Sequence, residues 1–355
     1  MSEREAARVE IAAWADEQGF LPGDGELVVG PWQILNFSSV YSVQRVGPDS
    51  RAGVFVKIPK SDFRRRTVLP ICLSDREMAE DEYRSLRYLE DHWPADGAAR
   101  YVQPLAFCRR YSAIVTRRSY ASDMFLSWRR HDLHRRVGLD AANPVRDWLV
   151  HLGRALREYH ETSAREEGQI IERRLGDPIA KIAASISRLR FYGAAVSTVA
   201  KMAEGLRHFE GITIESRSAM TLKGLDLRNV LLEEHGLLTL LDPGRLKLDD
   251  PVADVARLVA TCRILYWGSG WLFLGLRPSK MHEADLLEGY GAVDERSLKL
   301  LNLYLVKELF KQWVAAYVTI ERKTWPTAIK RALRRTYVDR FYRNECRIEL
   351  ARVMK

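Results

Sequence analysis

The sequence contains few cysteines and no long uninterrupted hydrophobic run. Its cysteines are scattered, and their spacing matches neither a disulfide framework nor a metal site. The longest apolar stretch, near residues 264–276, is interrupted by Gly268-Ser269-Gly270 and is too short to span a bilayer. The amino terminus is polar and lacks a signal-peptide core. The four cysteines are Cys72, Cys108, Cys262 and Cys346. These features argue against a disulfide-rich secreted scaffold and a membrane-spanning protein, so we expect a cytoplasmic protein.

Acidic residues are fewer than basic residues, with 47 Asp and Glu against 56 Lys and Arg, which gives a formal net charge of +9. This charge favours an anionic partner such as a phosphorylated glycan, an anionic lipid surface or nucleic acid. A basic, solvated surface accounts for it equally well. The 355 residues are 46% hydrophobic and contain no low-complexity tract, so the chain can bury a large core in two lobes or two domains.

The most informative pattern lies in residues 219–258. Asn229 precedes the apolar run 230–232, a turn at 233–236 leads to a second apolar run at 237–241, and this run ends in Asp242-Pro243-Gly244. The pattern predicts a β-hairpin that carries an Asn at one end and an Asp at the other. Two such oxygen ligands suit a hard cation such as Mg²⁺, which in turn binds phosphate oxygens.

This stretch resembles the catalytic core of the protein-kinase-like phosphotransferases, in particular the aminoglycoside phosphotransferase, choline kinase and lipopolysaccharide kinase-like branch. The family pattern is His-Gly-Asp-x-x-x-x-Asn, a hairpin, Asp-x-Gly, and then Asp-Pro-x-x-Asp-x-Ala. Asn229 and Asp242 fall on the metal-binding residues of that pattern, and Asp254 falls on the Asp that supports the catalytic loop. The resemblance therefore implies ATP and Mg²⁺ as cofactors.

The catalytic loop departs from the family pattern, because Gly224 stands in the position of the catalytic Asp. Asp226, two positions later, is our candidate for the base or for the residue that orients the substrate. Lys223 is the candidate for an additional phosphate contact. Two interpretations stay open: a phosphotransferase that uses Asp226, and a pseudokinase that binds nucleotide as a scaffold or regulator.

Upstream, three strands are expected at 32–37, 40–46 and 53–58. Ser38 and Ser39 lie in the first connection, where small residues would let the backbone and hydroxyl groups approach phosphates. Lys57 is embedded in the apolar third strand, so it requires a counter-charge or an anionic ligand. It resembles the strand lysine of kinases that holds the nucleotide phosphates.

A helix predicted at 74–92 offers the partner of that lysine. Glu82 is our choice, and Glu77 and Glu80 are competitors on the same helix. Two further strands are expected at 101–107 and 112–116. The second leads into a hinge at 117–120, where the family holds the adenine.

Helices dominate the rest of the chain, beginning with one at 143–161 whose His160 we interpret as structural. Residues 165–218 form an insertion with helical patterns at about 178–190 and 194–209. Small-molecule phosphotransferases of the family carry extra helices here, which argues against an atypical protein kinase. The tail from residue 327 is basic and amphipathic, a pattern typical of a helix that lies on an anionic membrane or packs on its own domain.

We therefore predict an α+β, bilobal protein-kinase-like fold: a small antiparallel β-sheet lobe with one helix, and a larger, mainly helical lobe. The N-terminal helix would span 1–19, the N-lobe 20–118 and the C-lobe 119–355. The predicted activity moves the γ-phosphate of ATP to a hydroxyl of a small molecule, sugar or glycolipid. The expected partners are the nucleotide and this acceptor, with a peripheral contact at the inner face of an anionic membrane. Nucleic acid is not an expected partner, because only the charge favours it.

Overall fold

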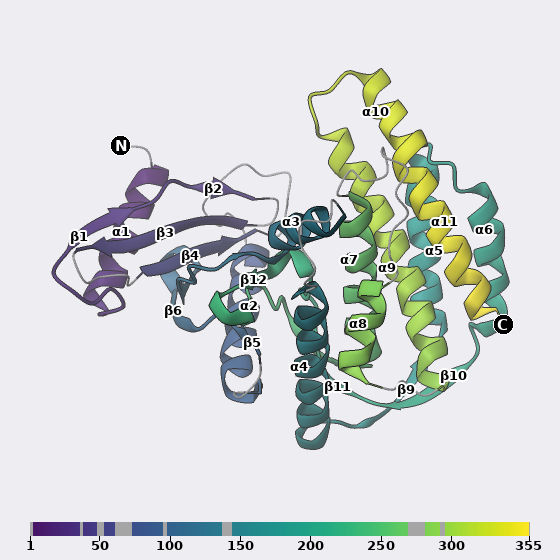
Figure 1. Cartoon of the computed structure of the whole chain (residues 1–355), viewed down its shortest axis with the longest axis horizontal. Coiled ribbons are helices and arrows are strands. Elements are labelled where there is room, and N and C mark those ends of the chain that lie inside the picture. The colour runs from purple at the N-terminus through teal and green to yellow at the C-terminus, as the bar shows by residue number, and fades with distance from the viewer. Residues whose placement is uncertain are drawn as a thin grey trace. The chain divides into compact units, whose positions relative to one another are not determined.

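The computed structural model describes residues 3–35, 38–47, 53–60, 73–94, 98–136, 144–268, 281–291 and 295–354. Contacts divide the chain into two compact units (Figure 1). The first comprises Met1–Arg130 and Leu222–Lys247, and the second comprises His131–Thr221 and Leu248–Lys355. Residues 222–247, which fall within the expected C-lobe 119–355, are grouped by their contacts with the first unit.

The first unit is built on an antiparallel sheet in the order β1-β3-β4-β7-β6, with β2 paired to β3. Its helix α1 (Glu3–Glu17) precedes the sheet, and Ile11 of α1 joins the same buried core as the strand residues Tyr41 and Val56. The strands are β1 (Glu26–Val29), β2 (Gln33–Ile34), β3 (Ser38–Val46), β4 (Gly53–Pro59), β6 (Pro104–Cys108) and β7 (Ala113–Arg117). The 3₁₀ turn Arg109–Tyr111 joins the last two.

Helix α2 (Leu73–His92) contacts β4 and β6 of this sheet. Its amphipathic pattern buries Ala79, Glu82, Leu86 and Leu89. Two of the expected strands differ in extent. The expected strand at 32–37 is the two-residue β2, and residues 36–37 lie outside the described part of the chain. The expected strand at 101–107 is wrong as a single element, because the chain breaks there into β5 (Ala99–Tyr101) and β6, which belong to different sheets.

A second, four-stranded sheet in this unit has the order β5-β13-β12-β8. Its centre is the expected hairpin of β12 (Val230–Leu232) and β13 (Leu238–Leu240), in which Val230 pairs with Leu240. The 3₁₀ turn Glu234–Gly236 closes the hairpin. Strand β5 pairs in parallel with β13, and β8 (Ser122–Asp123) pairs antiparallel with β12. The chain crosses between the units within α3 (Met124–Arg136), β11 (Ala219–Leu222) and β14 (Leu246–Asp249).

The second unit is mainly helical. Helices α4 and α8 approach closely because Gly153 and Gly289 face the partner helix: a Cβ on Gly153 would lie 2.3 Å from Leu286 O, and one on Gly289 would lie 2.0 Å from Val150 O. The helices are α4 (Pro144–Glu166), α5 (Gly176–Phe191), α6 (Ser197–Glu204), α7 (Val252–Gly268), α8 (Met281–Tyr290), α9 (Glu295–Glu321), α10 (Thr327–Leu333) and α11 (Asp339–Val353), with 3₁₀ residues Gly205–Phe209 after α6 and a π-turn at Arg334–Val338.

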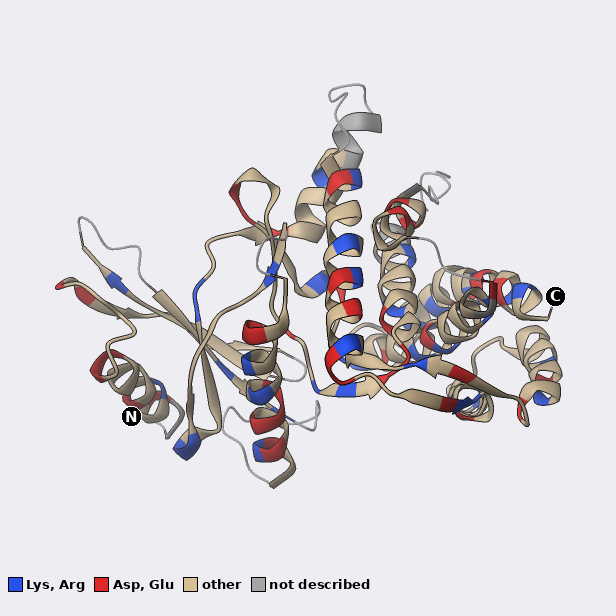
Figure 2. Ribbon diagram, turned by 90° about the horizontal axis from the view of Figure 1, so that it is seen from below, with Lys and Arg blue, Asp and Glu red and all other residues tan. Residues whose placement is uncertain are grey.

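The predicted insertion contains α5 and α6 together with a two-stranded sheet that the sequence did not predict. Strand β9 (Ile170–Arg174) pairs antiparallel with β10 (Thr213–Arg217). Both strands are rich in charged residues and alternate only between exposed and half-buried positions, so no run of buried apolar residues marks them as strands in the sequence. Basic and acidic residues are interspersed along α4 (Figure 2). Such mixed charges are expected on the solvent-facing side of an amphipathic helix.

The apolar side of the C-terminal tail packs inside the second unit. Val338, Phe341, Tyr342 and Leu350 are buried, and α11 contacts α9 extensively. Of the two alternatives for this tail, packing on its own domain is the one observed for α11. Within the described part of the chain, none of the helices has the length and apolar character needed to cross a membrane.

Candidate nucleotide and metal site

Lys57 lies at the centre of a charged cluster in the first unit. Strand β4 alternates, so Val54, Val56 and Ile58 are fully buried in the sheet core while Lys57 lies on the opposite face. Its Nζ is 2.5 Å from Glu82 Oε1 and 2.8 Å from Asp242 Oδ2. The lysine thus donates to two carboxylates from distant parts of the sequence.

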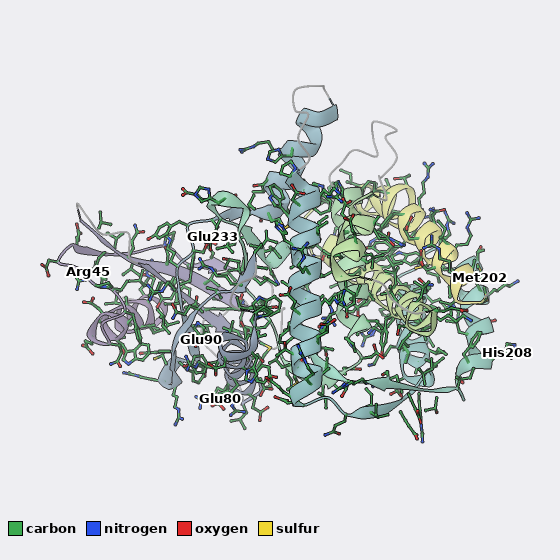
Figure 3. All side chains as sticks on the ribbon, turned by 60° about the horizontal axis from the view of Figure 1, so that its bottom comes forward. Arg45, Glu80, Glu90, Met202, His208 and Glu233 are labelled. Carbon is green, nitrogen blue, oxygen red and sulfur yellow. The ribbon has the colours of Figure 1, made fainter. Side chains whose placement is uncertain are left out.

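The partner on helix α2 is Glu82, as the sequence favoured. Its side chain is 7% exposed. The competitors have different surroundings: Glu77 is exposed, and Glu80, labelled in Figure 3, pairs with Arg84 at 3.1 Å. The burial of Ala79, Leu86 and Leu89 turns Glu82 towards the sheet, because these positions share one helical face.

Electrostatics set the ionisation of this pair. Burial alone would lower the pKa of Lys57, but the neighbouring Glu82 and Asp242 carboxylates raise it above its ordinary value. Burial raises the pKa of Glu82 to about 7, aided by the Asp242 charge and opposed by Lys57. Lys57 therefore stays protonated at neutral pH, whereas Glu82 changes its charge close to neutrality.

The hairpin places Asn229 and Asp242 at the same end. Asn229 directly precedes β12, Asp242 follows β13, and the Leu241 amide donates to Asn229 O at 2.9 Å. Asn229 Nδ2 donates to Gly224 O at 3.4 Å, and Asp242 Oδ1 accepts from the Gly244 amide at 3.2 Å. The Asp242 side chain is 36% exposed, which leaves it accessible to a ligand.

Helix α2 also fixes the segment that follows Asp242. The Ser85 hydroxyl accepts a hydrogen bond from the Leu246 amide at 3.2 Å and donates one to Asp81 O at 2.7 Å. Both bonds offset the cost of burying this polar group. The same helix thereby positions both the Glu82 carboxylate and the chain beyond the Asp242 turn.

Gly224 has no room for a side chain. A Cβ at this position would lie 2.5 Å from Asp242 O, 2.6 Å from Gly244 N and 2.8 Å from Pro243 C. All three are backbone atoms, so they cannot rotate away as a flexible side chain would. The Gly224 amide also donates to Pro243 O at 2.8 Å. The loop that contains Gly224 is therefore packed directly on the Asp242-Pro243-Gly244 turn.

Asp226 caps the 3₁₀ turn Leu227–Asn229. Its Oδ1 accepts the Arg228 amide at 2.9 Å and Arg228 Nε at 2.8 Å, and its Oδ2 pairs with Arg228 Nη2 at 2.5 Å. The Asp226 side chain is 13% exposed and that of Arg228 is 54% exposed. Arg228 was missed by sequence reasoning, although its position two residues from Asp226 was visible. Lys223 is exposed, as a phosphate contact would require.

Ser38 and Ser39 belong to strand β3, opposite Pro59 and Ile58 of β4. Both are buried, and Ser39 Oγ has no hydrogen-bond partner among the described residues. The adjacent residues 36–37 of the expected connection lie outside those residues. Phosphate contacts from the two serines stay a prediction.

Glu233, which is labelled in Figure 3, links the hairpin turn to the predicted hinge through Ser119 and was also missed by sequence reasoning. It accepts from Arg100 Nη2 at 2.7 Å, from Ser119 Oγ at 3.3 Å and from the Thr239 hydroxyl. Burial opposes the charge of Glu233, but the bonds from Thr239 and Arg100 prevail and lower its pKa. This carboxylate thus holds the 117–120 segment to the second sheet.

Asp254 lies in the second unit and is fully buried. Its carboxylate bonds His160 Nε2 at 3.3 Å and Arg257 Nη1 at 3.1 Å, and Tyr290 OH lies 3.1 Å from His160 Nδ1. His160 is structural in this network, as expected. The support of the catalytic loop by Asp254 stays a prediction.

The donors available for a metal ion are oxygen atoms. In the part of the chain that the structure describes, no group of three or more His, Cys, Asp or Glu side chains could hold a metal. A site made by Asn229 and Asp242 would therefore need further ligands from phosphate or water. That requirement fits Mg²⁺, which is usually bound by one or two carboxylates plus substrate phosphates.

Comparison with solved structures establishes the fold. A macrolide 2'-phosphotransferase type I superposes with a TM-score of 0.53 at 15% identity, covering 95% of this chain and 98% of that chain. An aminoglycoside 2'-phosphotransferase-IIIa mutant solved with GDP gives a TM-score of 0.56 at 12% identity, and the match covers 98% of this chain and 97% of that chain. A choline kinase from Streptococcus pneumoniae gives a TM-score of 0.51 at 13% identity, and the match covers 98% of this chain and 99% of that chain.

The chain therefore has the α+β fold of the protein-kinase-like phosphotransferases, as the residue pattern predicted. The fold is shared with the aminoglycoside phosphotransferase and choline kinase structures. No protein-family model matches the sequence, and no curated protein matches it either.

Proposed function

We propose that the protein is an ATP-dependent phosphotransferase that moves the γ-phosphate to a hydroxyl of a small molecule, sugar or glycolipid. The observation that carries the proposal is the placement of Lys57 between Glu82 and Asp242, on a fold whose neighbours are small-molecule phosphotransferases. Phosphoryl transfer depends mainly on positioning and on neutralising phosphate charge, and this cluster supplies both kinds of group.

In this proposal Lys57 contacts the nucleotide phosphates. Its ammonium carries three donors, of which one reaches Glu82 and one reaches Asp242. Glu82 holds the lysine in place, because a buried carboxylate on a helix has less freedom than a solvent-exposed one. Several neighbours of known structure were solved with ADP, GDP or AMP, which supports a nucleotide as the ligand.

Asn229 and Asp242 would hold Mg²⁺. Both supply oxygen donors at one end of the hairpin, and the partial exposure of Asp242 leaves it open to a ligand. When bound, Mg²⁺ would neutralise charge on the phosphates. Asp242 would then serve both the metal and Lys57, so its removal should affect nucleotide binding more than removal of any other carboxylate in the loop.

Asp226 would orient the acceptor hydroxyl or accept its proton. Both carboxylate oxygens of Asp226 accept hydrogen bonds from the Arg228 side chain. One of these bonds must therefore break before the acceptor hydroxyl can bind Asp226. Arg228 is the more exposed partner and can move. The pair thus provides a carboxylate whose position is fixed by the backbone bond from the Arg228 amide.

A pseudokinase is the second candidate, and the packing at Gly224 favours it. The position that carries the catalytic Asp in the family pattern cannot hold a side chain here. In that case the chain would bind Mg·ATP through Lys57, Asn229 and Asp242 without transferring phosphate.

The test uses γ-labelled ATP with a panel of hydroxyl compounds: aminoglycosides, macrolides, choline and monosaccharides. We expect transfer to at least one acceptor class, loss of transfer in Asp226→Asn with ATP affinity retained, and loss of both in Asp242→Ala. Asn can still cap the turn, so Asp226→Asn removes the charge with little effect on the fold. Asp123→Asn is the matched control, because Asp123 caps the Leu126 amide of α3 at 3.0 Å. ATP binding without transfer to any acceptor would favour the pseudokinase.

A further inference from the structure

A cavity of about 360 Å³ lies in the second unit, between the end of α5, the end of α9 and the segment from α10 to the π-turn. Its size is within the range of small-ligand pockets. The residues that line it are Tyr192, Gly193, Tyr317, Glu321, Thr327, Lys330, Arg331, Arg334 and Arg335. Four of these side chains are cationic and one is a carboxylate. The lining therefore carries a clear excess of positive charge.

Two of the cations build the cavity wall. Lys330 Nζ donates to Glu321 O at 2.7 Å, and Arg334 Nη2 donates to Tyr317 O at 3.3 Å and to the Glu321 carboxylate. The Arg334 guanidinium also lies 4.9 Å from the centre of the Tyr317 ring. Tyr317 is itself fixed, because its hydroxyl donates to the buried Asp339 at 2.8 Å. These contacts attach α10 and the π-turn to the end of α9.

The other two cations, Arg331 and Arg335, are exposed and make no ion pair with a carboxylate in the portion of the chain that the structure describes. They are four positions apart, where like charges on a helix repel each other. The one carboxylate in the lining, Glu321, is engaged by Arg334, and this bond lowers its pKa. The excess charge of the cavity is therefore that of Lys330, Arg331 and Arg335, and of these three Lys330 is held by the Glu321 backbone carbonyl.

The π-turn at Arg334–Val338 forms part of the same wall. Single π-turns within helices are rare and are frequently found at functional sites. Gly193, which also lines the cavity, follows α5 with a positive φ of 73°, and a Cβ there would meet no atom of the described residues within 4 Å. The cavity thus has a fixed aromatic and basic wall and, at Gly193, a stretch of backbone without a side chain.

We propose that this cavity binds a phosphate group of an anionic ligand, with Arg331 and Arg335 as its main contacts. Guanidinium groups bind phosphate oxygens through paired, charge-assisted hydrogen bonds. The phosphate can belong to a soluble phosphorylated compound or to a phospholipid headgroup. A lipid source is compatible with Trp325 and Ile329, which are 44% and 53% exposed and flank the start of α10. The proposal does not depend on the phosphotransferase activity.

The first experiment is a calorimetric titration with inorganic pyrophosphate in the presence of a metal chelator. It compares the wild type with the double variant Arg331→Gln/Arg335→Gln. The control is Arg340→Gln/Arg343→Gln, which removes the same charge from exposed positions of α11 outside the cavity. We expect the cavity variant to bind pyrophosphate about tenfold more weakly or worse, and the control to bind like the wild type. Equal weakening in both variants would overturn the proposal, because it would show a non-specific effect of charge.

The second experiment distinguishes the two sources of phosphate. Sedimentation with vesicles of phosphatidylcholine, with and without phosphatidylglycerol, is measured for the same three proteins. Binding to the anionic vesicles that is lost only in the cavity variant supports the site with a lipid phosphate. Pyrophosphate binding that is lost only in that variant supports it with a soluble ligand. If neither probe responds to Arg331→Gln/Arg335→Gln, the proposal is refuted.

Discussion

Replacing Gly224 by Asp restores, in sequence, the residue that the phosphotransferase pattern carries at this position. The structure nevertheless predicts that this change damages the protein. The new Cβ would lie 2.5 Å from Asp242 O and 2.6 Å from Gly244 N. Either the loop or the turn must then shift, which would move Asp242 away from Lys57 and weaken the bond from the Gly224 amide to Pro243 O.

The expected cost follows from two contributions. Overpacking against fixed atoms costs about 1–3 kcal/mol, and loss of one backbone hydrogen bond adds about 1 kcal/mol. The sum is about 2–4 kcal/mol, which corresponds to a fall in melting temperature of roughly 5 °C or more for a unit of this size. Gly224→Ala should lose nearly as much stability, because the clash begins at Cβ.

Differential scanning fluorimetry, with and without Mg·ATP, measures both the melting temperature and its rise on nucleotide binding. Gly211 is the matched control: it is exposed, and among the residues that the structure describes a Cβ there would meet no atom within 4 Å. Gly211→Ala and Gly211→Asp should unfold close to the wild-type temperature and keep the nucleotide response, whereas both Gly224 variants should lose it. A Gly224→Asp protein with wild-type stability and increased phosphate transfer would refute the reasoning, because it would show that the loop accommodates a catalytic Asp.

Three further predictions concern charge and packing. Because the pKa of Glu82 is raised, the folded state retains the Glu82 proton up to about pH 7. Binding of this proton therefore stabilises the fold fully below about pH 4.5, and this contribution is lost as the pH rises through 7. Glu82→Gln should flatten the pH dependence of the free energy of unfolding, and an unchanged dependence would contradict the raised pKa of Glu82. Asp339→Ala leaves the buried donors of Trp313 and Tyr317 unpaired and should cost about 3 kcal/mol in chemical denaturation, with a smaller loss for Asp339→Asn. Gly153→Ala should force α4 and α8 apart and destabilise the second unit by about 1–3 kcal/mol, whereas an unaltered denaturation midpoint would show that the helices can separate without cost.

Local patterns in the sequence predicted those site residues whose position is set within a single strand, helix or hairpin. The alternation of β4 indicated that Lys57 needs a counter-charge, and the apolar face of α2 favoured Glu82. The hairpin that carries Asn229 and Asp242 was visible because its two strands are neighbours in sequence.

Features that depend on distant segments were not predictable in this way. The parallel pairing of β5 with β13 joins strands that are distant in the sequence, and a three-residue strand gives no signal of its partner. The bond between Glu233 and Arg100, a residue of β5, arises from the same arrangement. The close packing at Gly224 depends on backbone atoms of the Asp242 turn, so a glycine in the sequence indicated a missing catalytic residue but not the lack of space for one.

The central claim is that Lys57, Asn229 and Asp242 form a site for a metal–nucleotide complex. A titration of melting temperature with ATP, with and without Mg²⁺, tests it most directly on the wild type and Asp242→Ala. A ligand that binds the native state raises the melting temperature by mass action. We predict a dose-dependent rise that requires Mg²⁺ and is lost in Asp242→Ala. No rise at millimolar ATP, or an equal rise in both proteins, would contradict the account.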